Sequence, residues 1–362
     1  MTESTPWQIS RAAVSAIERG QNFPGMEAML ALSNVLFVDP KELVERARIS
    51  TSVPVDVTDV GADELEARAA RHFWAGRFRE ALAVYDALAE RYALEEQPDP
   101  RRMAILEVRR ATALKRSGAL ISAIGRAENA ITLSAPFPDV QCEAYVALAD
   151  LQCQRGLLPL ASDAAARAIE LAEAHGSEQA RMWAWMVKAH VQFLAGQFAR
   201  ARESWVEARR RATAIGDDTH LSHIEGDIGL TYMESDEPQE ARRWIRRALE
   251  RARRRGLPAL EASWLVVLGR LALLAGDPDE ADACAVSALR IARPRDNHIT
   301  VFRAEWLRHR VVRRKYPSRS DGRRLARLRK LFLRLDQHEG VPEIREFKAT
   351  LLTADAHEGP TR

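Results

Sequence analysis

The chain has 362 residues, of which 46% are hydrophobic and 29% are charged, and its net charge is +3. This length allows a substantial core, and this composition excludes a disordered or fibrous chain. No apolar run follows a basic start in the first thirty residues, and the most apolar stretch, 263–275, is too short to span a bilayer. We therefore expect a cytoplasmic protein without a membrane segment.

The first 48 residues contain a series of helix signals. In the segment 10–20, Ser10 is a suitable N-cap, Val14 and Ile17 form an inward face, and Gly20 ends the helix. A Gln-Asn-Phe-Pro turn and an amphipathic segment follow. A short helix then begins at Asp-Pro-Lys-Glu, which combines an N-cap, a proline at the first helical position and an acid at the third. This order resembles the helix-turn-helix domain of the Cro/repressor-type (Xre) regulators, from the recognition helix onward.

The resemblance implies that the start of the segment 10–20 enters the major groove of DNA. An arginine there would pair with guanine, and alanine methyl groups would contact thymine. Arg19 and Asn22 would contact phosphate. The alternative is that these arginines are simply exposed charges. The residues predicted to contact DNA are Ser10, Arg11, Ala12, Ser15, Ala16, Arg19 and Asn22.

The head departs from the family in one respect. The family has two helices before the recognition helix, and only the segment 1–8 stands there in this sequence. A fragment of this kind is too small for a stable core. Either the native protein begins upstream, which we favour, or the head has decayed and covers the first end of the next domain. Residues 49–60 lack helical periodicity and contain a proline, so they are predicted to be a linker.

Residues 61–336 repeat one template. A turn residue recurs at separations of 42, 38, 40, 40 and 40 positions, an alanine stands five residues after each, and another small residue or Leu88 stands seven further on. Gly or Asp at the turn ends a helix in the left-handed conformation, and the alanine lies where the helix crosses the next one. Prolines at 238 and 278 occupy the first positions of second helices. The turn residues are Gly76, Gly118, Gly156, Gly196, Asp236 and Gly276.

Each such hairpin has an apolar face that only a neighbouring hairpin can bury, which predicts a stack. The Gly-x-Phe-x-x-Ala turns at Gly76 and Gly196 resemble those of tetratricopeptide (TPR) repeats, although a period of about 40 implies longer helices than the usual 34-residue repeat. The longer form resembles the sensor halves of certain bacterial regulators. We predict an all-α, TPR-like α-solenoid of about seven hairpins with a partial helix-turn-helix head. The last hairpin, 297–336, is an atypical cap, and a C-terminal helix and tail occupy 337–362.

Aromatic residues concentrate in the central hairpins. Most are expected to fill the core between repeats. One or two would line the concave groove, where TPR proteins usually hold a peptide or a partner helix. The sequence does not distinguish among Trp183, Trp185, Phe193, Trp205, Trp244 and Trp264.

Two segments are strongly basic. Residues 301–334 contain thirteen Arg or Lys and two acidic residues, and residues 242–255 contain eight Arg and one Glu. This asymmetry is compatible with nucleic acid or another acidic partner. The interpretation that we favour is that both segments are solvated helix faces, ion-paired with neighbouring acidic helices.

No pattern in the sequence indicates catalysis. His220 and His223 share a predicted helix face near two aspartates, but they lack a third ligand and the His-Glu-x-x-His spacing of a metal site. There is no Gly-x-x-x-x-Gly-Lys phosphate loop. The three cysteines, Cys142, Cys153 and Cys284, have no metal-ligand spacing and are expected to be small buried hydrophobes. We therefore expect no enzyme, no cofactor and no metal.

These features predict a bacterial DNA-binding transcriptional regulator whose TPR body senses a peptide or protein ligand. A homodimer on a palindromic site is the default expectation for such a head. The alternative is a TPR interaction scaffold whose truncated head does not bind DNA. A ligand would control DNA binding only if it bound one pitch of the superhelix better than another.

Overall fold

The computed structural model describes residues 60–74, 77–295, 297–316, 321–335 and 341–357, together with the single residues 32, 33 and 35. The chain divides into two compact units, 1–133 and 134–362. Every regular element of both units, within the described residues, is a helix. The all-α fold predicted from the sequence is confirmed.

The described helices form seven hairpins, as the repeat predicted. Unit 1 contains α4 (Ala62–Trp74) with α5 (Phe78–Ala93), and α6 (Pro100–Ser117) with α7 (Leu120–Leu133). Unit 2 contains five hairpins and a final helix. They are α8 (Pro138–Gln154) and α9 (Leu158–His175), α10 (Glu178–Leu194) and α11 (Phe198–Ala214), α12 (Asp218–Glu234) and α13 (Pro238–Arg254), α14 (Pro258–Leu274) and α15 (Pro278–Ala292), α16 (His298–Lys315) and α17 (Gly322–Leu335), and then α18 (Pro342–His357).

The hairpin turns have the predicted left-handed conformation. At Gly118, φ is +88°, and the following N–H, that of Ala119, donates to the carbonyl of Leu114, as in a Schellman cap. Asp236 adopts φ +59° without being glycine, a conformation that Asp tolerates better than most residues. Gly156, Gly196 and Gly276 have φ between +73° and +84°, while Gly76 lies outside the described residues.

Small residues lie where the helices of a hairpin cross. The alanines five residues after each turn, Ala81, Ala123, Ala161, Ala201, Ala241 and Ala281, are all 0% exposed. A second small position, seven residues before each turn, was missed from the sequence. It holds Ala69, Ala111, Ala149, Ala189, Gly229 and Gly269. A Cβ at Gly229 would lie 2.8 Å from the side chain of Ile245, so any side chain there would force Ile245 to move.

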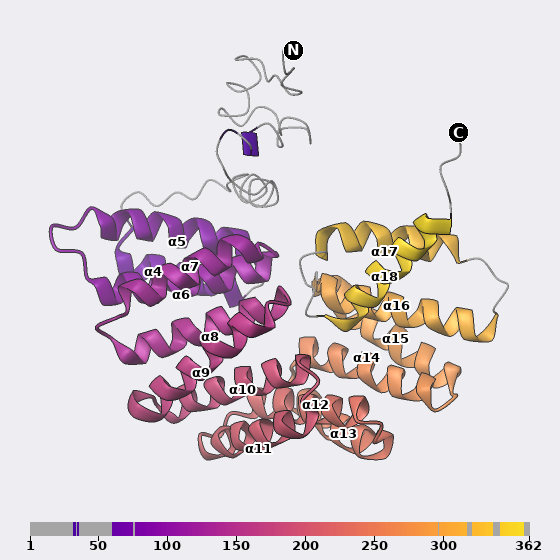
Figure 1. The fold of residues 1–362 in the computed structure, drawn as a ribbon. Helices are drawn as coiled ribbons and strands as arrows, with labels where there is room; N and C mark the ends of the chain where they lie inside the picture. The colour runs from indigo at the N-terminus through magenta and orange to yellow at the C-terminus, as the bar shows by residue number, and fades with distance from the viewer. Residues whose placement is uncertain are drawn as a thin grey trace, which may run out of the picture. The chain divides into compact units, whose positions relative to one another are not determined.

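In unit 2 the first helices of successive hairpins contact one another, α8 with α10, α12 with α14, and α14 with α16. They form one layer, and the second helices form the other (Figure 1). Apolar clusters join neighbouring hairpins, since Trp264 of α14 packs in the same cluster as Ile245 of α13 and Leu307 of α16. At the end of the stack, Ile344 and Phe347 of α18 pack in one cluster with side chains of α16 and α17.

The predicted burial of the cysteines is confirmed. Cys142, Cys153 and Cys284 are free and buried, and burial raises the pKa of the Cys142 thiol to about 12. None of the described helices combines the length and apolarity that a membrane crossing needs.

Candidate ligand-binding site

A cavity of about 160 Å³ lies against the layer of first helices in unit 2. Side chains of α10, α12, α14, α16 and the start of α18 line it, together with Trp205 of α11. Because first helices of four hairpins and α18 meet at this one cavity, their layer is the concave side of the unit. A water occupies about 30 Å³ in the liquid, so the cavity has room for one side chain of a ligand. Its apolar walls are Phe193, Leu194, Leu230, Ile299, Val341 and Pro342.

The charges that line the cavity are paired with one another. Arg270 of α14 donates to Glu343 of α18 at 3.2 Å and to Glu234 of α12 at 3.4 Å. Arg303 of α16 donates to the same oxygen of Glu343 at 3.1 Å. Burial by itself would raise the pKa of Glu343, but Arg303 and Arg270 outweigh burial and lower it. Glu343 is therefore a buried carboxylate that ties α18 to α14 and α16.

Two polar atoms of the cavity lining are left without a partner. The indole Nε1 of Trp205, which is 2% exposed, has no hydrogen-bond acceptor among the described residues. The second oxygen of Glu343, Oε2, has no donor there either, and this residue is also 2% exposed. An unsatisfied buried polar group costs about 1–3 kcal/mol, so native proteins contain few of them. Both residues line the same cavity, and each of them buries one polar atom that has no partner among the described residues.

The structure distinguishes the six aromatic residues that the sequence left open. Phe193 and Trp205 line the cavity. Trp185 donates to Glu173 at 3.1 Å, and Lys188 lies over its ring. Trp244 lies on α13 between two arginines, Arg209 at 5.2 Å and Arg247 at 5.5 Å from the ring centroid. Trp264 is 4% exposed and belongs to the core.

The two histidines of α12 have separate partners. Trp183 donates to Nε2 of His220 at 3.3 Å, so His220 carries its proton on Nδ1 and donates to Asp217 at 2.6 Å. His223 pairs instead with Asp227, 2.9 Å away. No group of three or more His, Cys, Asp or Glu residues in the described part of the chain is arranged to hold a metal ion.

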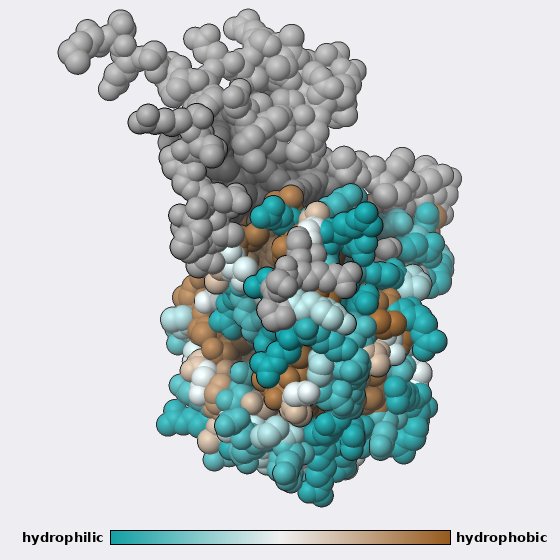
Figure 2. Space-filling view, turned by 90° about the vertical axis from the view of Figure 1, so that its right-hand side faces the viewer, coloured by the Kyte–Doolittle hydropathy of each residue, from teal (hydrophilic) through white to brown (hydrophobic). Residues whose placement is uncertain are grey.

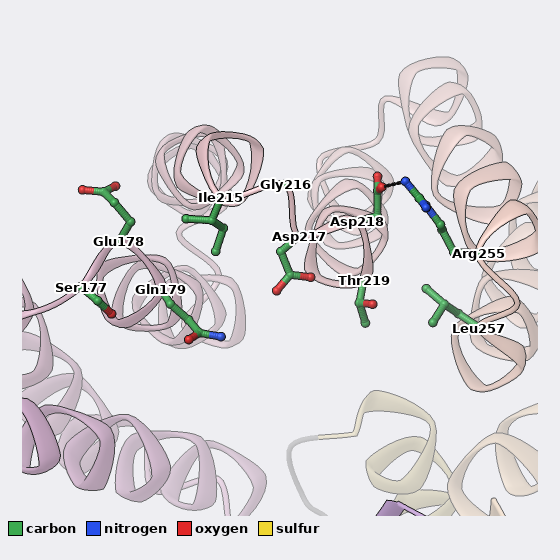
Figure 3. A pocket seen from close by; sticks show the side chains of 10 residues that line it. All are labelled: Ser177, Glu178, Gln179, Ile215, Gly216, Asp217, Asp218, Thr219, Arg255 and Leu257. Carbon is green, nitrogen blue, oxygen red and sulfur yellow. Dashed lines mark hydrogen bonds and ion pairs between the residues drawn. The ribbon is translucent and has the colours of Figure 1, made fainter.

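A larger depression, of about 730 Å³, lies where the loops before α10, α12 and α14 meet (Figure 3). Its charged groups already have partners. Asp217 accepts from the backbone N–H of His220 at 3.0 Å and caps α12, while Ser177 caps α10. Asp218 is paired with Arg255, as the dashed line in Figure 3 marks, and a hydrogen bond from Arg251 lowers the pKa of the Asp218 carboxyl. Because the charged groups of this depression are already paired, we regard the inner cavity as the better candidate for a ligand-binding site.

The arginine-rich face of α13 is paired with acidic helices, as the favoured interpretation of its charge predicted. Glu225 of α12 is 0% exposed and accepts two hydrogen bonds from Arg251, both at 3.0 Å, and Arg247 lies 2.7 Å from it. Arg242 pairs with Glu280 of the next hairpin. Figure 2 shows a mostly hydrophilic face of unit 2 whose hydrophobic side chains form separate patches.

The residues predicted to contact DNA lie outside the described residues, and so does the predicted linker 49–60 except for its last residue. They are Ser10, Arg11, Ala12, Ser15, Ala16, Arg19 and Asn22. DNA binding therefore stays a prediction from the sequence.

Comparison with known families places the chain among helical-repeat proteins. The tetratricopeptide repeat model matches residues 221–293, which extend from within α12 through α15. The chain therefore contains TPR repeats within a TPR-like solenoid. No curated protein matches the sequence.

Several solved structures share the fold. A Rap protein complexed with Competence and Sporulation Factor aligns with a TM-score of 0.62 at 14% identity, over 91% of this chain and 94% of that one. NprR in complex with its cognate peptide NprX aligns with a TM-score of 0.59 at 12% identity, over 96% and 94%. Aspartyl phosphate phosphatase F from Bacillus subtilis aligns with a TM-score of 0.54 at 12% identity, over 86% and 97%. At these identities the similarity is one of fold.

Proposed function

We propose that the described TPR array is a peptide-binding sensor and that the cavity between α10 and α18 is its binding site. The observation that carries the proposal is the pair of unpartnered buried atoms, Trp205 Nε1 and Glu343 Oε2, in one cavity of the concave face. TPR proteins usually hold peptides or partner helices on that face. NprR, which shares the fold, was solved with a peptide bound. We propose a binding role, without catalysis, for this site.

The test is selection of peptides from a random heptapeptide phage library on the full chain. Selected peptides are then synthesised with a fluorescein label, and their affinity is measured by fluorescence anisotropy. We expect that Leu230→Glu, which puts a carboxylate into the apolar wall, weakens binding at least about tenfold, because a buried charge without a partner is costly.

The matched control is Val206→Glu, which adds the same charge at a side chain that is 51% exposed on α11. We expect this variant to bind like the wild type. Equal affinity of the wild type and both variants would mean that peptides bind elsewhere, and the proposal would fail.

We further propose that the array is the sensor of a bacterial transcriptional regulator whose head, residues 1–48, binds DNA as a homodimer. The support is the order of helix signals in the head, which matches the Cro/repressor-type pattern from Ser10 onward. Selection of random DNA duplexes on the chain tests this function. We expect an enriched palindrome that Arg11→Ala binds about tenfold more weakly, the loss typical of one bidentate contact to guanine.

The alternative function is a TPR interaction scaffold whose head does not bind DNA. Under this alternative no duplex is enriched, and Arg11→Ala has no effect, while peptides are still selected. The two selections together therefore distinguish a regulator from a scaffold.

A further inference from the structure

The inner cavity combines one unpartnered donor with one unpartnered acceptor. We propose that it binds the primary amide of an Asn or Gln side chain, with the indole N–H of Trp205 donating to the amide oxygen and Glu343 Oε2 accepting from the amide N–H. This inference rests on the proposed function, because it names the group that a bound peptide inserts into the cavity.

The hydrogen-bonding capacities of the two atoms determine the chemistry of the ligand. An indole nitrogen is only a donor, and an ionised carboxylate oxygen is only an acceptor. The carboxylate of Glu343 is ionised, because Arg303 and Arg270 lower its pKa despite its burial. The complementary group therefore carries both an acceptor and a donor, as a primary amide does. A group with only one of the two leaves a buried atom of the cavity unpaired.

The charges around the cavity disfavour an ionic ligand group. A carboxylate would lie near Glu343, Glu234 and Asp227, and an ammonium would lie near Arg270 and Arg303. The two arginines are already neutralised by Glu343 and Glu234, through hydrogen bonds of 3.1, 3.2 and 3.4 Å. Burying one more charge beside this group is unfavourable, whereas a neutral dipole loses little on burial when it is hydrogen-bonded.

The walls of the cavity suit the apolar part of an Asn or Gln side chain. Phe193 and Leu194 come from α10, Leu230 from α12, and Val341 and Pro342 from the residues that begin α18. The volume of about 160 Å³ corresponds to about five waters of the liquid, enough for one such side chain. Because Glu343 and two of these wall residues belong to the start of α18, the docking of α18 completes the pocket.

The test uses butyramide as the probe and its isostere 2-pentanone as the matched ligand, in which a methyl group replaces the amide nitrogen. Binding is measured by NMR, both on the ligands and on the indole N–H signals of the full chain labelled with ¹⁵N at tryptophan. The Trp205 signal is identified as the one that Trp205→Phe removes. We expect butyramide to shift this signal downfield and to bind roughly fivefold to a hundredfold more tightly than 2-pentanone, which leaves Glu343 Oε2 unpaired.

Two variants provide matched controls within the protein. Trp205→Phe removes the donor of the cavity and should weaken butyramide binding at least about fivefold. Trp264→Phe removes another buried indole N–H without a partner, but one that does not line the cavity, so butyramide affinity should stay unchanged. Urea unfolding of both variants checks that the fold is retained.

Equal binding of butyramide and 2-pentanone would overturn the proposal, because the cavity would then be merely apolar. Stronger binding of butyrate or butylammonium would overturn it in favour of an ionic ligand. If butyramide leaves the Trp205 signal unchanged while the selected peptides still bind, the amide assignment is wrong and the peptide-binding function stands. If neither butyramide nor any peptide binds, the proposed function fails as well.

Discussion

A glutamate carboxylate is buried both beside the arginine-rich face of α13 and in the inner cavity, but its hydrogen bonding differs between the two places. On the α13 side, Glu225 is fully buried and both of its oxygens accept hydrogen bonds from Arg251. In the cavity, Glu343 is 2% exposed and its two hydrogen bonds, from Arg270 and Arg303, go to one oxygen, so the other oxygen has no partner. A high density of arginine therefore marks a structural network here. Incomplete hydrogen bonding beside a cavity marks the place that we propose as the binding site.

The largest predicted loss in the free energy of unfolding is on the α13 side, and it tests this comparison. Arg251→Ala leaves the buried Glu225 with Arg247, whose side chain is 55% exposed, as its remaining partner. Removing one partner of a buried ion pair typically costs 3–5 kcal/mol, and since Arg247 stays we expect a loss of about 3 kcal/mol in the free energy of unfolding. Urea unfolding followed by circular dichroism measures it.

The control for this loss is Arg246→Ala, at an exposed arginine of α13 without an ion pair among the described residues. We expect a change within about 0.5 kcal/mol there. Similar losses at Arg251 and Arg246 would mean that helix propensity, and not the buried carboxylate, explains both.

A smaller loss in the free energy of unfolding is expected from a substitution where α12 and α14 approach each other in the layer of first helices. A Cβ at Gly226 would lie 2.2 to 2.5 Å from three atoms of the Trp264 ring, so Gly226→Ala forces the indole to move. Overpacking of this kind costs about 1–3 kcal/mol. Gly125→Ala is the matched control, because nothing lies within 4 Å of its Cβ position in α7. It should stabilise the chain by about 0.5–1 kcal/mol through helix propensity. The same sign for both variants in urea unfolding would contradict this account.

Removing the charge of Glu343 tests how firmly the cavity is closed at α18. Glu343→Gln weakens two charge-assisted hydrogen bonds, so we expect the start of α18 to be destabilised by about 1.5 kcal/mol. Hydrogen exchange of the α18 amides should then be about tenfold faster, while α8 and α9 stay unchanged. Unchanged exchange in α18 would mean that its apolar contacts with α16 hold it without the carboxylate.

The sequence predicted the hairpins because their signals are local. A turn residue and an alanine five positions later are adjacent in the chain, and both meet the steric demands of one helix crossing. The cavity could not be predicted in this way, because Phe193 and Glu343 are separated by three hairpins and meet only through the curvature of the stack.

The different surroundings of Trp205 and Trp244 did have a signal in the repeat register. Trp205 stands nine residues after its turn, like the buried Ile245, while Trp244 stands eight residues after its own. One residue rotates a side chain by about 100° around a helix, so Trp205 points into the array and Trp244 toward its outer face. The DNA-contacting residues remain predictions, since they lie outside the described part of the chain.

The smallest predicted loss in the free energy of unfolding is at Glu207, whose carboxylate is more exposed than that of Glu225 or Glu343. Glu207 on α11 has a side chain that is 27% exposed and accepts from Arg210 at 2.7 and 3.0 Å and from Arg211 at 2.8 Å. The two hydrogen bonds from Arg210, and then the one from Arg211, outweigh burial and lower the pKa of Glu207 to about 2. The folded state thus holds this carboxylate charged at pH values where the unfolded chain binds a proton.

A depressed pKa in the folded state stabilises the protein above the ordinary pKa of about 4.5, and this stabilisation is lost as the pH falls toward 2. We expect Glu207→Gln to cost about 0.5 kcal/mol at pH 6, the size of exposed pairs within a helix, and nothing near pH 2. Urea unfolding at both pH values measures the difference, with the exposed Glu250→Gln on α13 as the control whose effect should not follow this curve. Because water screens Glu207, 1 M NaCl should remove most of its contribution. If Glu207→Gln still costs stability at pH 6 in 1 M NaCl, the ion pairs of Glu207 behave like the buried network around Glu225. Burial would then not explain the difference between exposed and buried carboxylates in this protein.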